Sequence, residues 1–224
     1  MENKTKKTKE KAYIVPIILS IAVWAVLFIS AGSFKYWEAW VFWIGFSLIT
    51  FFITVYFTKN DPELLSRRMK HEEKETTKKA PAMLKLYYIG FILPGLDFRF
   101  HWSNVQIWIA IISNLVAFAG YIFIIFVFKE NSYASNIIQI ESEQHVITTG
   151  PYSIVRHPMY LGMVVMSLFI PLALGSYWAT IPMLLIMPIT IFRIKAEEEI
   201  LLRGLKGYKD YCLKTRYRLI PLIW

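Results

Sequence analysis

The sequence is poor in cysteine, histidine and charge. Its one cysteine, Cys212, excludes an intrachain disulfide, and four scattered histidines argue against a structural zinc site, so we predict no metal. Charged residues make up 18% of the 224 residues, against about 25% in soluble proteins, whereas 56% are hydrophobic and 17% are aromatic. This balance excludes a disordered chain, a coiled coil and most soluble enzymes. It predicts a polytopic membrane protein.

Long apolar runs give the positions of the expected membrane helices. A spanning helix needs about 20 mostly apolar residues. Four runs before residue 130 are long enough or nearly so, although the third is shorter and contains Pro94-Gly95: Ile14–Ala31, Glu38–Phe57, Met83–Phe98 and Val105–Phe128.

The last apolar stretch, Met159–Phe192, is too long for one span. As a single helix it would measure about 50 Å, whereas the hydrocarbon core of a bilayer is about 30 Å thick. Leu174-Gly175-Ser176 lies near its middle, where a tight turn fits. We therefore predict an all-α bundle of about six transmembrane helices, with an N-terminal four-helix region (residues 1–130) and a second region (residues 131–224) that contains a C-terminal helical hairpin.

The distribution of basic residues predicts the orientation in the membrane. Six spans bring the N-terminus, the loops 58–85 and 129–158, and the C-terminus to one side. Of the 25 Lys and Arg residues, all but Lys35 and Arg99 fall on that side. The positive-inside rule makes it the cytoplasmic side, and it explains most of the net charge of +9 without a nucleic-acid partner.

Two cytoplasmic segments contain helix-start signals. Asp61-Pro62-Glu63 combines a good N-cap, a proline suited to the first helical position and an acid near the positive end of the helix dipole. The residues that follow, 64–70, mix apolar and basic side chains, which suits a helix lying in the membrane interface.

The second segment is Gln139–Tyr160, QIESEQHVITTGPYSIVRHPMY, which is too polar to be buried in lipid. Gly150-Pro151 predicts a turn, and His157-Pro158 predicts the start of a helix. The free N–H groups of that helix start, beside Arg156, would suit an anionic group.

A cluster of acids follows the apolar hairpin, in the run Arg193-Ile194-Lys195-Ala196-Glu197-Glu198-Glu199. Acids near a helix C-terminus are unfavourable, so we expect Arg156, Arg193 or a bound cation to stabilise them. Arg193 and Glu197 share a helix face, and Glu198 is turned by about a further 100°. The sequence leaves open which glutamate faces a pocket. The alternative interpretation is purely structural: Arg156 forms an ion pair with Glu197 or Glu198 at the membrane boundary, and the cluster has no functional role.

Taken together, these motifs resemble the isoprenylcysteine carboxyl methyltransferase family and its relatives among the membrane phospholipid methyltransferases. The resemblance rests on GPYSIVRHPMYLG, RIKAEEEILL and GYKDYCLKTRYRLIP, with DPELLSRRM and PGLDFRFHWS upstream. It implies a transferase that uses S-adenosylmethionine at a site open to both the cytosol and the lipid. Residues 131–224 would then be the catalytic region, with a cofactor-binding loop, the membrane hairpin and a cytoplasmic tail.

The resemblance also implies roles for single residues. The cofactor pocket would contain Gln139, Gln144, His145, Val146, Ile147, Tyr152, His157, Pro158, Met159 and Tyr160, and Glu198 would close it. Arg156, at the expected helix start, suits the cofactor's carboxylate. Arg193 would hold a carboxylate acceptor, whereas Glu197 could take the proton of an amine acceptor.

Methyl transfer to a lipophilic carboxylate, such as an isoprenylcysteine that enters from the bilayer, is therefore the first hypothesis. N-methylation of an aminophospholipid is the alternative within the same superfamily. A membrane reductase would use a nicotinamide cofactor, but we find no Gly-rich dinucleotide fingerprint. A structural or transport subunit would predict charged residues within the spans, and essentially none lie away from their ends.

Overall fold

The computed structural model describes residues 2–68, 80–135, 138–141 and 143–224, and over this part of the chain it contains helices and no strands. The all-α prediction is therefore confirmed. The elements are α1 (Glu2–Ala31), α2 (Trp37–Asn60), α3 (Pro62–Arg68), α4 (Ala80–Phe100), α5 (Ile107–Glu130), a 3₁₀ turn η1 (Gly150–Ser153), α6 (Pro158–Ala173), α7 (Thr180–Leu184), α8 (Ile186–Gly204) and α9 (Tyr208–Lys214).

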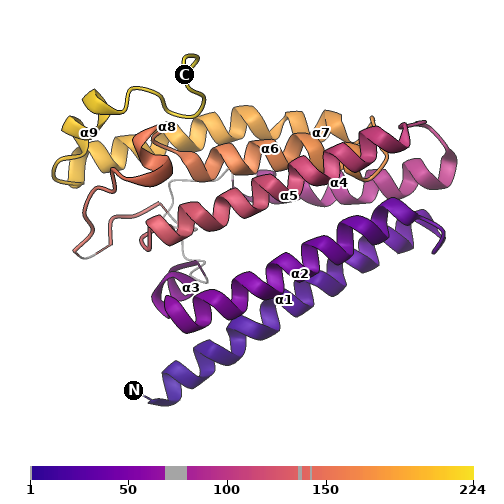
Figure 1. Ribbon diagram of the computed structural model, residues 1–224, viewed down its shortest axis with the longest axis horizontal. Helices are drawn as coiled ribbons and strands as arrows, with labels where there is room; N and C mark the ends of the chain where they lie inside the picture. The colour runs from indigo at the N-terminus through magenta and orange to yellow at the C-terminus, as the bar shows by residue number, and fades with distance from the viewer. Residues whose placement is uncertain (1, 69–79, 136–137, 142) are drawn as a thin grey trace.

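The long helices run roughly along one axis of the molecule (Figure 1). The pair α1 and α2 lies on one side, and α4 to α8 lie together on the other. A core cluster joins the two groups and draws its buried side chains from α1, α2, α5, α6 and the turns that flank them: Val23, Leu27, Phe28, Ala31, Tyr36, Ala39, Phe42, Ala117, Ile170 and Leu174. The short helices α3 and α9 lie at the same end of the molecule as the N-terminus (Figure 1).

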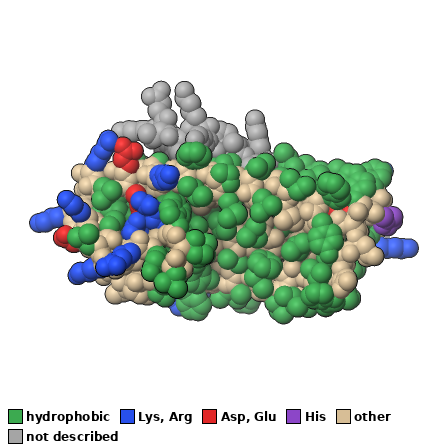
Figure 2. Space-filling view, turned by 90° about the horizontal axis from the view of Figure 1, so that it is seen from above, with side chains coloured by type: hydrophobic (Ala, Val, Ile, Leu, Met, Phe, Trp, Pro, Cys, Tyr) green, Lys and Arg blue, Asp and Glu red, His purple; other side chains and the backbone are tan. Residues whose placement is uncertain are grey.

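Within the part of the chain that the structure describes, three helices are long and apolar enough to cross a membrane: Tyr13–Ala31, Trp37–Asn60 and Ile107–Glu130. They match three of the predicted spans. Figure 2 shows hydrophobic side chains over the middle of the molecule and Lys and Arg gathered mainly at one end. The predicted count of about six spans is not confirmed. With 16 residues, α6 measures only about 24 Å. The third predicted span, Met83–Phe98, lies in α4 and is not among the spans found within the described residues.

The C-terminal hairpin is present. Helix α6 ends at Ala173, and Gly175 takes a positive φ of 72° that few other residues adopt, which reverses the chain. The returning arm is divided at Leu185 into α7 and α8. Its Pro188 has no N–H to donate to the carbonyl of Leu184, and the Leu185 N–H bonds instead to the Pro182 carbonyl at 3.2 Å. The missing N–H of Pro188 explains why the returning arm forms two helices and not one continuous helix.

Glycines bring α5 and α6 close together. A Cβ atom on Gly162 would lie 2.6 Å from the side chain of Ile124 and 3.2 Å from the Gly120 carbonyl. Such close approach of small residues is typical of helix packing in membranes. It holds the first turn of α6 beside the end of α5.

A polar clamp lies at the end of the molecule opposite α3 and α9. Buried Asp97, near the end of α4, accepts hydrogen bonds from the Ser103 N–H at 2.6 Å, the Ser103 hydroxyl at 2.7 Å and the Ser176 hydroxyl. The Tyr36 hydroxyl donates to the Leu174 carbonyl in the same hairpin turn. The clamp thus ties the turn between α6 and α7 to α2 and α4.

The predicted interface helix begins where the sequence places it. The Leu64 N–H donates to the Asp61 carboxylate at 2.9 Å, so Asp61 caps α3. The Arg68 guanidinium packs 4.4 Å from the Phe128 ring centroid, and its Nη1 lies 3.6 Å from the Met159 sulfur. Residues 69 and 70, the last two of the predicted mixed apolar and basic segment, lie outside the described residues.

Replacing Asp97 with alanine should lower the melting temperature. The buried Ser176 hydroxyl and the half-buried Ser103 hydroxyl and N–H would lose their acceptor, and an unsatisfied buried polar group costs about 1–3 kcal/mol. Thermal unfolding of the purified protein measures the effect. Asp210→Ala, at an exposed position in α9, is the control. Equal melting temperatures for the two variants would contradict the clamp.

Candidate active site

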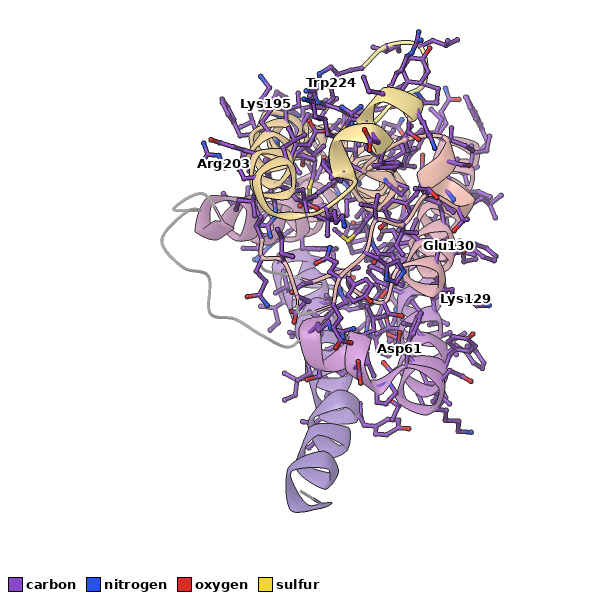
Figure 3. The ribbon with its side chains drawn as sticks, turned by 90° about the vertical axis from the view of Figure 1, so that its left-hand side faces the viewer. Asp61, Lys129, Glu130, Lys195, Arg203 and Trp224 are labelled. Carbon is purple, nitrogen blue, oxygen red and sulfur yellow. The ribbon has the colours of Figure 1, made fainter. Side chains whose placement is uncertain are left out.

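A cavity opens at the end of the molecule that carries α3, α9 and the C-terminus. Figure 3 views this end, where Asp61, Lys129, Glu130, Lys195, Arg203 and Trp224 are labelled. The loop after α5, the start of α6, the second half of α8 and helix α9 form its walls. All but two of the predicted site residues line it: Gln139, Gln144, His145, Val146, Ile147, Tyr152, Arg156, His157, Met159, Tyr160, Arg193 and Glu197.

The two exceptions are Pro158 and Glu198, which do not line the cavity. Pro158 is the buried first residue of α6, directly after the N-cap residue His157, and this agrees with the predicted helix start. Glu198 was expected to close the pocket. Glu197 lines the cavity in its place, because Glu198 is held in the wall behind it by charged partners.

The carboxylate of Glu198 joins three segments of the chain. Arg156 Nε donates to Oε1 at 2.7 Å, Arg218 Nε donates to Oε2 at 2.6 Å, and His157 Nε2 lies 3.3 Å from Oε1. Burial by itself raises the pKa of Glu198, but hydrogen bonds from His157, Arg218 and Arg156 outweigh it and lower the pKa from 4.5 to about 2. The ion pair of the alternative interpretation, between Arg156 and a glutamate, is therefore present, with Glu198 as its acid.

The same cluster changes the interpretation of Arg156. Besides Glu198, its guanidinium donates through Nη1 to the carbonyls of Thr215 and Arg216, each at 2.8 Å. These contacts hold the C-terminal segment against the start of α6. Arg156 lines the cavity, but Nε and Nη1 of its guanidinium are already bonded within the wall, to Glu198 and to the two carbonyls. The contact with a cofactor carboxylate stays a prediction.

Within the cavity, Tyr160 connects Arg193 and Glu197. The buried Tyr160 hydroxyl donates to Glu197 Oε2 at 2.8 Å and accepts from Arg193 Nε at 3.0 Å. Glu197 and Arg193 therefore share a face of α8, as the helical period predicts. The cavity presents an oriented carboxylate and an oriented guanidinium, separated by one phenol.

His157 lies between the two glutamates. Its Nδ1 is 4.0 Å from Glu197 Oε1, and its Nε2 is 3.3 Å from Glu198 Oε1. The ring is almost fully buried and packs near Tyr160, with 5.9 Å between the ring centroids. His157 thus couples the position of the cavity carboxylate to that of the buried ion cluster.

The loop side of the cavity is aromatic and amide-rich. Asn131, at the end of α5, donates to the Tyr152 hydroxyl at 2.8 Å, and burial raises the pKa of Tyr152, which keeps it protonated. The Tyr133 hydroxyl lies 3.2 Å from His145 Nδ1, and the two rings meet edge to face. Flat rings and amides of this kind suit a ligand with an aromatic base.

Sequence reasoning missed ten lining residues: Asn131, Tyr133, Ala134, Ser135, Ile138, Ile200, Leu201, Leu205, Tyr208 and Tyr211. Leu201 and Leu205 follow Glu197 at intervals of four, so the helical period could have indicated them once Glu197 was assigned to the cavity. The loop residues carry no comparable signal, since irregular backbone has no period.

Comparison with known families adds one finding. The model of the Isoprenylcysteine carboxyl methyltransferase (ICMT) family matches residues 109–203. The matched segment includes most of α5, all of α6 and α7, and α8 up to its last residue but one. It ends before Leu205, Tyr208 and Tyr211. No curated protein sequence matches the chain.

Replacing Glu198 with glutamine should destabilise the fold by on the order of 3 kcal/mol, because two guanidiniums would lose their buried counter-charge. Thermal unfolding checks this. Glu199→Gln is the matched control, since the pair Glu199–Arg203 is exposed on the same helix and contributes little.

The pH dependence of stability provides a second measurement of the contribution of Glu198. A folded pKa below the ordinary value means that the contribution of Glu198 is complete above about pH 4.5 and is lost as the pH falls through about 2. Glu198→Gln should lack this component. A glutamine variant as stable as the wild type at pH 7 would contradict the assigned cluster.

Proposed function

Because the match over residues 109–203 places this chain in the isoprenylcysteine carboxyl methyltransferase family, we propose that it methylates the carboxylate of an isoprenylcysteine or a similar lipophilic acid. We propose S-adenosylmethionine as the methyl donor. The family supports a membrane methyltransferase, and the three apolar helices support an integral membrane protein. The observation that carries the finer proposal is the Arg193–Tyr160–Glu197 arrangement in the cavity.

The cavity residues fit the parts of such a cofactor. Tyr152, Tyr133 and His145 offer flat rings to an adenine, and Gln139 and Gln144 offer amides at the loop side. Glu197 offers a carboxylate to the ribose hydroxyls or to a positively charged group. The bound cofactor would supply an electrophilic methyl group on a sulfonium. Near it the buried rings of Tyr160 and His157 would help to exclude water from an in-line displacement.

Arg193 supports a carboxylate as the acceptor. A planar guanidinium fork matches a carboxylate with two parallel hydrogen bonds, whereas it repels an ammonium. The bond from its Nε to Tyr160 orients the fork toward the cavity. A carboxylate is already a nucleophile at pH 7, so the acceptor needs alignment and no strong base.

The position of Arg193 also suits a substrate that arrives through the bilayer. The residue before it, Phe192, is 54% exposed on the apolar part of α8. A guanidinium on an apolar stem can stay at the membrane surface while the stem lies in lipid. A prenylated acid could therefore keep its chain among membrane lipids and bring only its carboxylate to Arg193.

The acceptor class can be tested with radiolabelled S-adenosylmethionine and two candidate acceptors, a small prenylcysteine analogue and phosphatidylethanolamine. We expect label in the analogue that alkali releases as volatile methanol. Arg193→Lys should reduce this activity about ten- to a hundredfold, because the two-pronged contact is lost. Lys195→Ala, at an exposed position two residues away, should leave it unchanged. Alkali-stable label on the lipid headgroup would replace the proposal with N-methylation.

We further propose that both termini and the cavity face the cytoplasm. The ends of α2, α5 and α8 and the start of α6 all lie at the cavity end of the molecule (Figure 3), where most of the basic side chains gather. The positive-inside rule assigns that end to the cytoplasm.

Cysteine labelling tests this orientation in a Cys212→Ser background. Cysteines at the exposed positions Ser153 and Lys209 should react with an impermeant reagent only from the cytoplasmic side. A cysteine at exposed Lys35, at the opposite end, should react only from outside. Labelling of all three positions from the same side would contradict the proposed topology.

A further inference from the structure

The C-terminal loop (residues 218–224) lies on the flank of the molecule and is closed by its own backbone. Helix α9 lies at the cavity end, and from it the chain runs back along the long axis to the C-terminus beside α8 (Figure 1). The N–H groups of residues 218–220 all point to the Trp224 carbonyl, at 2.9, 2.9 and 3.2 Å, and the Trp224 N–H donates to the Ile220 carbonyl at 3.1 Å. These bonds leave residues 221–223 at the tip of the loop.

Two aliphatic side chains at this tip are almost fully exposed. Leu222 is 85% exposed and Ile223 is 77% exposed, more than any other large hydrophobic side chain in the described residues, those of the apolar helices included. Leu222 also has a φ of 67°, in the left-handed region, where a Cβ atom crowds the backbone and glycine is favoured. The closed backbone keeps both side chains from folding back onto the protein, so only something outside the chain could cover them.

The base of the loop packs against the helical hairpin. Leu219 is buried in a core cluster with side chains from both arms of the hairpin: Tyr160, Val164 and Ile194. Val164 lies six residues after Pro158, the first residue of α6, which is about 9 Å along the helix axis. The loop therefore lies beside the apolar arms and not beyond their end, at a level where a hairpin in a membrane meets lipid.

The residues around the tip are those that membrane surfaces favour. The Arg218 guanidinium lies 5.4 Å from the Trp224 ring centroid, and the exposed side chains of Lys214 and Arg216 precede the loop. Tryptophan is enriched at the boundary between lipid and water, and basic side chains there attract anionic phosphate groups. Single exposed aliphatic residues are ordinary on protein surfaces. An adjacent pair between an indole and basic groups, on the flank of an apolar hairpin, indicates a lipid surface as the partner.

We propose that the C-terminal loop is an interaction surface for the bilayer. Leu222 and Ile223 insert into the leaflet on the cavity side, and Lys214 and Arg216 bind its anionic phosphate groups. The inference goes beyond the proposed methyl transfer, because it needs only that the hairpin lies in a membrane.

The inserted loop would link the lipid surface to the cavity wall. The carbonyls of Tyr217 and Arg218 accept hydrogen bonds from the N–H groups of Arg156 and His157, each at 2.9 Å. Arg156 and His157 line the cavity. A loop held in the leaflet therefore fixes the start of α6, and with it the cavity, at the membrane surface.

Spin labels on single cysteines test the proposal in the whole chain, with Cys212→Ser, reconstituted into vesicles of phosphatidylcholine and phosphatidylglycerol. A label at Ile223→Cys should collide more often with oxygen, which concentrates in lipid, than with a water-soluble nickel chelate. Lys209→Cys, exposed on α9, should show the reverse. Ile21→Cys, 59% exposed within the membrane helix α1, gives the reference for lipid.

Replacing Leu222 in the labelled Ile223→Cys protein tests the insertion itself. Leu222→Ser should shift the equilibrium between the inserted and the withdrawn loop about tenfold or more toward the withdrawn state, as expected for one leucine that leaves lipid. The measured accessibility to the nickel chelate should rise accordingly. Leu222→Met is the matched control, because it keeps an apolar side chain at the same backbone position, and it should leave the accessibility unchanged.

Equal accessibility of the labels at residues 223 and 209 to the nickel chelate would overturn the proposal. So would shielding of residue 223 that disappears when the vesicles hold fewer copies of the protein per lipid, since a second copy would then be the partner. If the reference label at residue 21 is also open to the chelate, the protein does not span the bilayer as assigned, and the failure lies in the membrane placement. Failure at residue 223 alone leaves the proposed function intact.

Discussion

The candidate site depends on the buried ion pairs and hydrogen bonds that the Glu198 carboxylate forms. This carboxylate binds the guanidiniums of Arg156 and Arg218 and lies within hydrogen-bond distance of the His157 ring. These partners come from the start of α6 and from the C-terminal segment, so one buried acid joins three parts of the chain. Backbone bonds from Arg156 and His157 to the carbonyls of Tyr217 and Arg218 reinforce the junction. Removing the acid would leave the buried guanidinium of Arg156 without a counter-charge, which folded proteins tolerate poorly.

This constraint gives two neighbouring glutamates different roles. Consecutive residues on a helix point about 100° apart, so holding Glu198 in the wall directs Glu197 into the cavity. There the Tyr160 hydroxyl orients Glu197, and Arg193 in turn binds Tyr160. The guanidinium of Arg156 is bonded to Glu198 and to two backbone carbonyls within the wall, and the cavity itself presents Arg193 and Glu197. That pair suits a reaction between a cationic methyl donor and an anionic acceptor, in which alignment matters more than proton transfer.

The membrane part of the fold holds these groups in place from a distance. The close contact between Gly120 and Gly162 fixes α6 against α5, and the start of α6 carries His157 and Tyr160. At the opposite end, Asp97 fixes the turn from which α7 and α8 return to the cavity. A hairpin anchored at its turn and closed by an ion cluster at its open end leaves its arms little freedom to shift. Precise placement of catalytic groups needs such support.

The local features of this protein could be predicted from its sequence. Composition and apolar runs determined the helical class and three spans, and Gly175 marked the hairpin turn. The family resemblance indicated twelve of the 22 residues that line the cavity. The helical period placed Arg193 and Glu197 on one face, but it could not say which face points inward. The tertiary structure decided that Glu197 lines the cavity, that Arg156 pairs with Glu198 and that α9 contributes to the wall. The physical reason is the distance along the chain over which each effect acts. Periodicity and turn chemistry act between residues that are close in the sequence. Which face of a helix points inward is decided by distant partners such as Arg218, which only folding brings into contact.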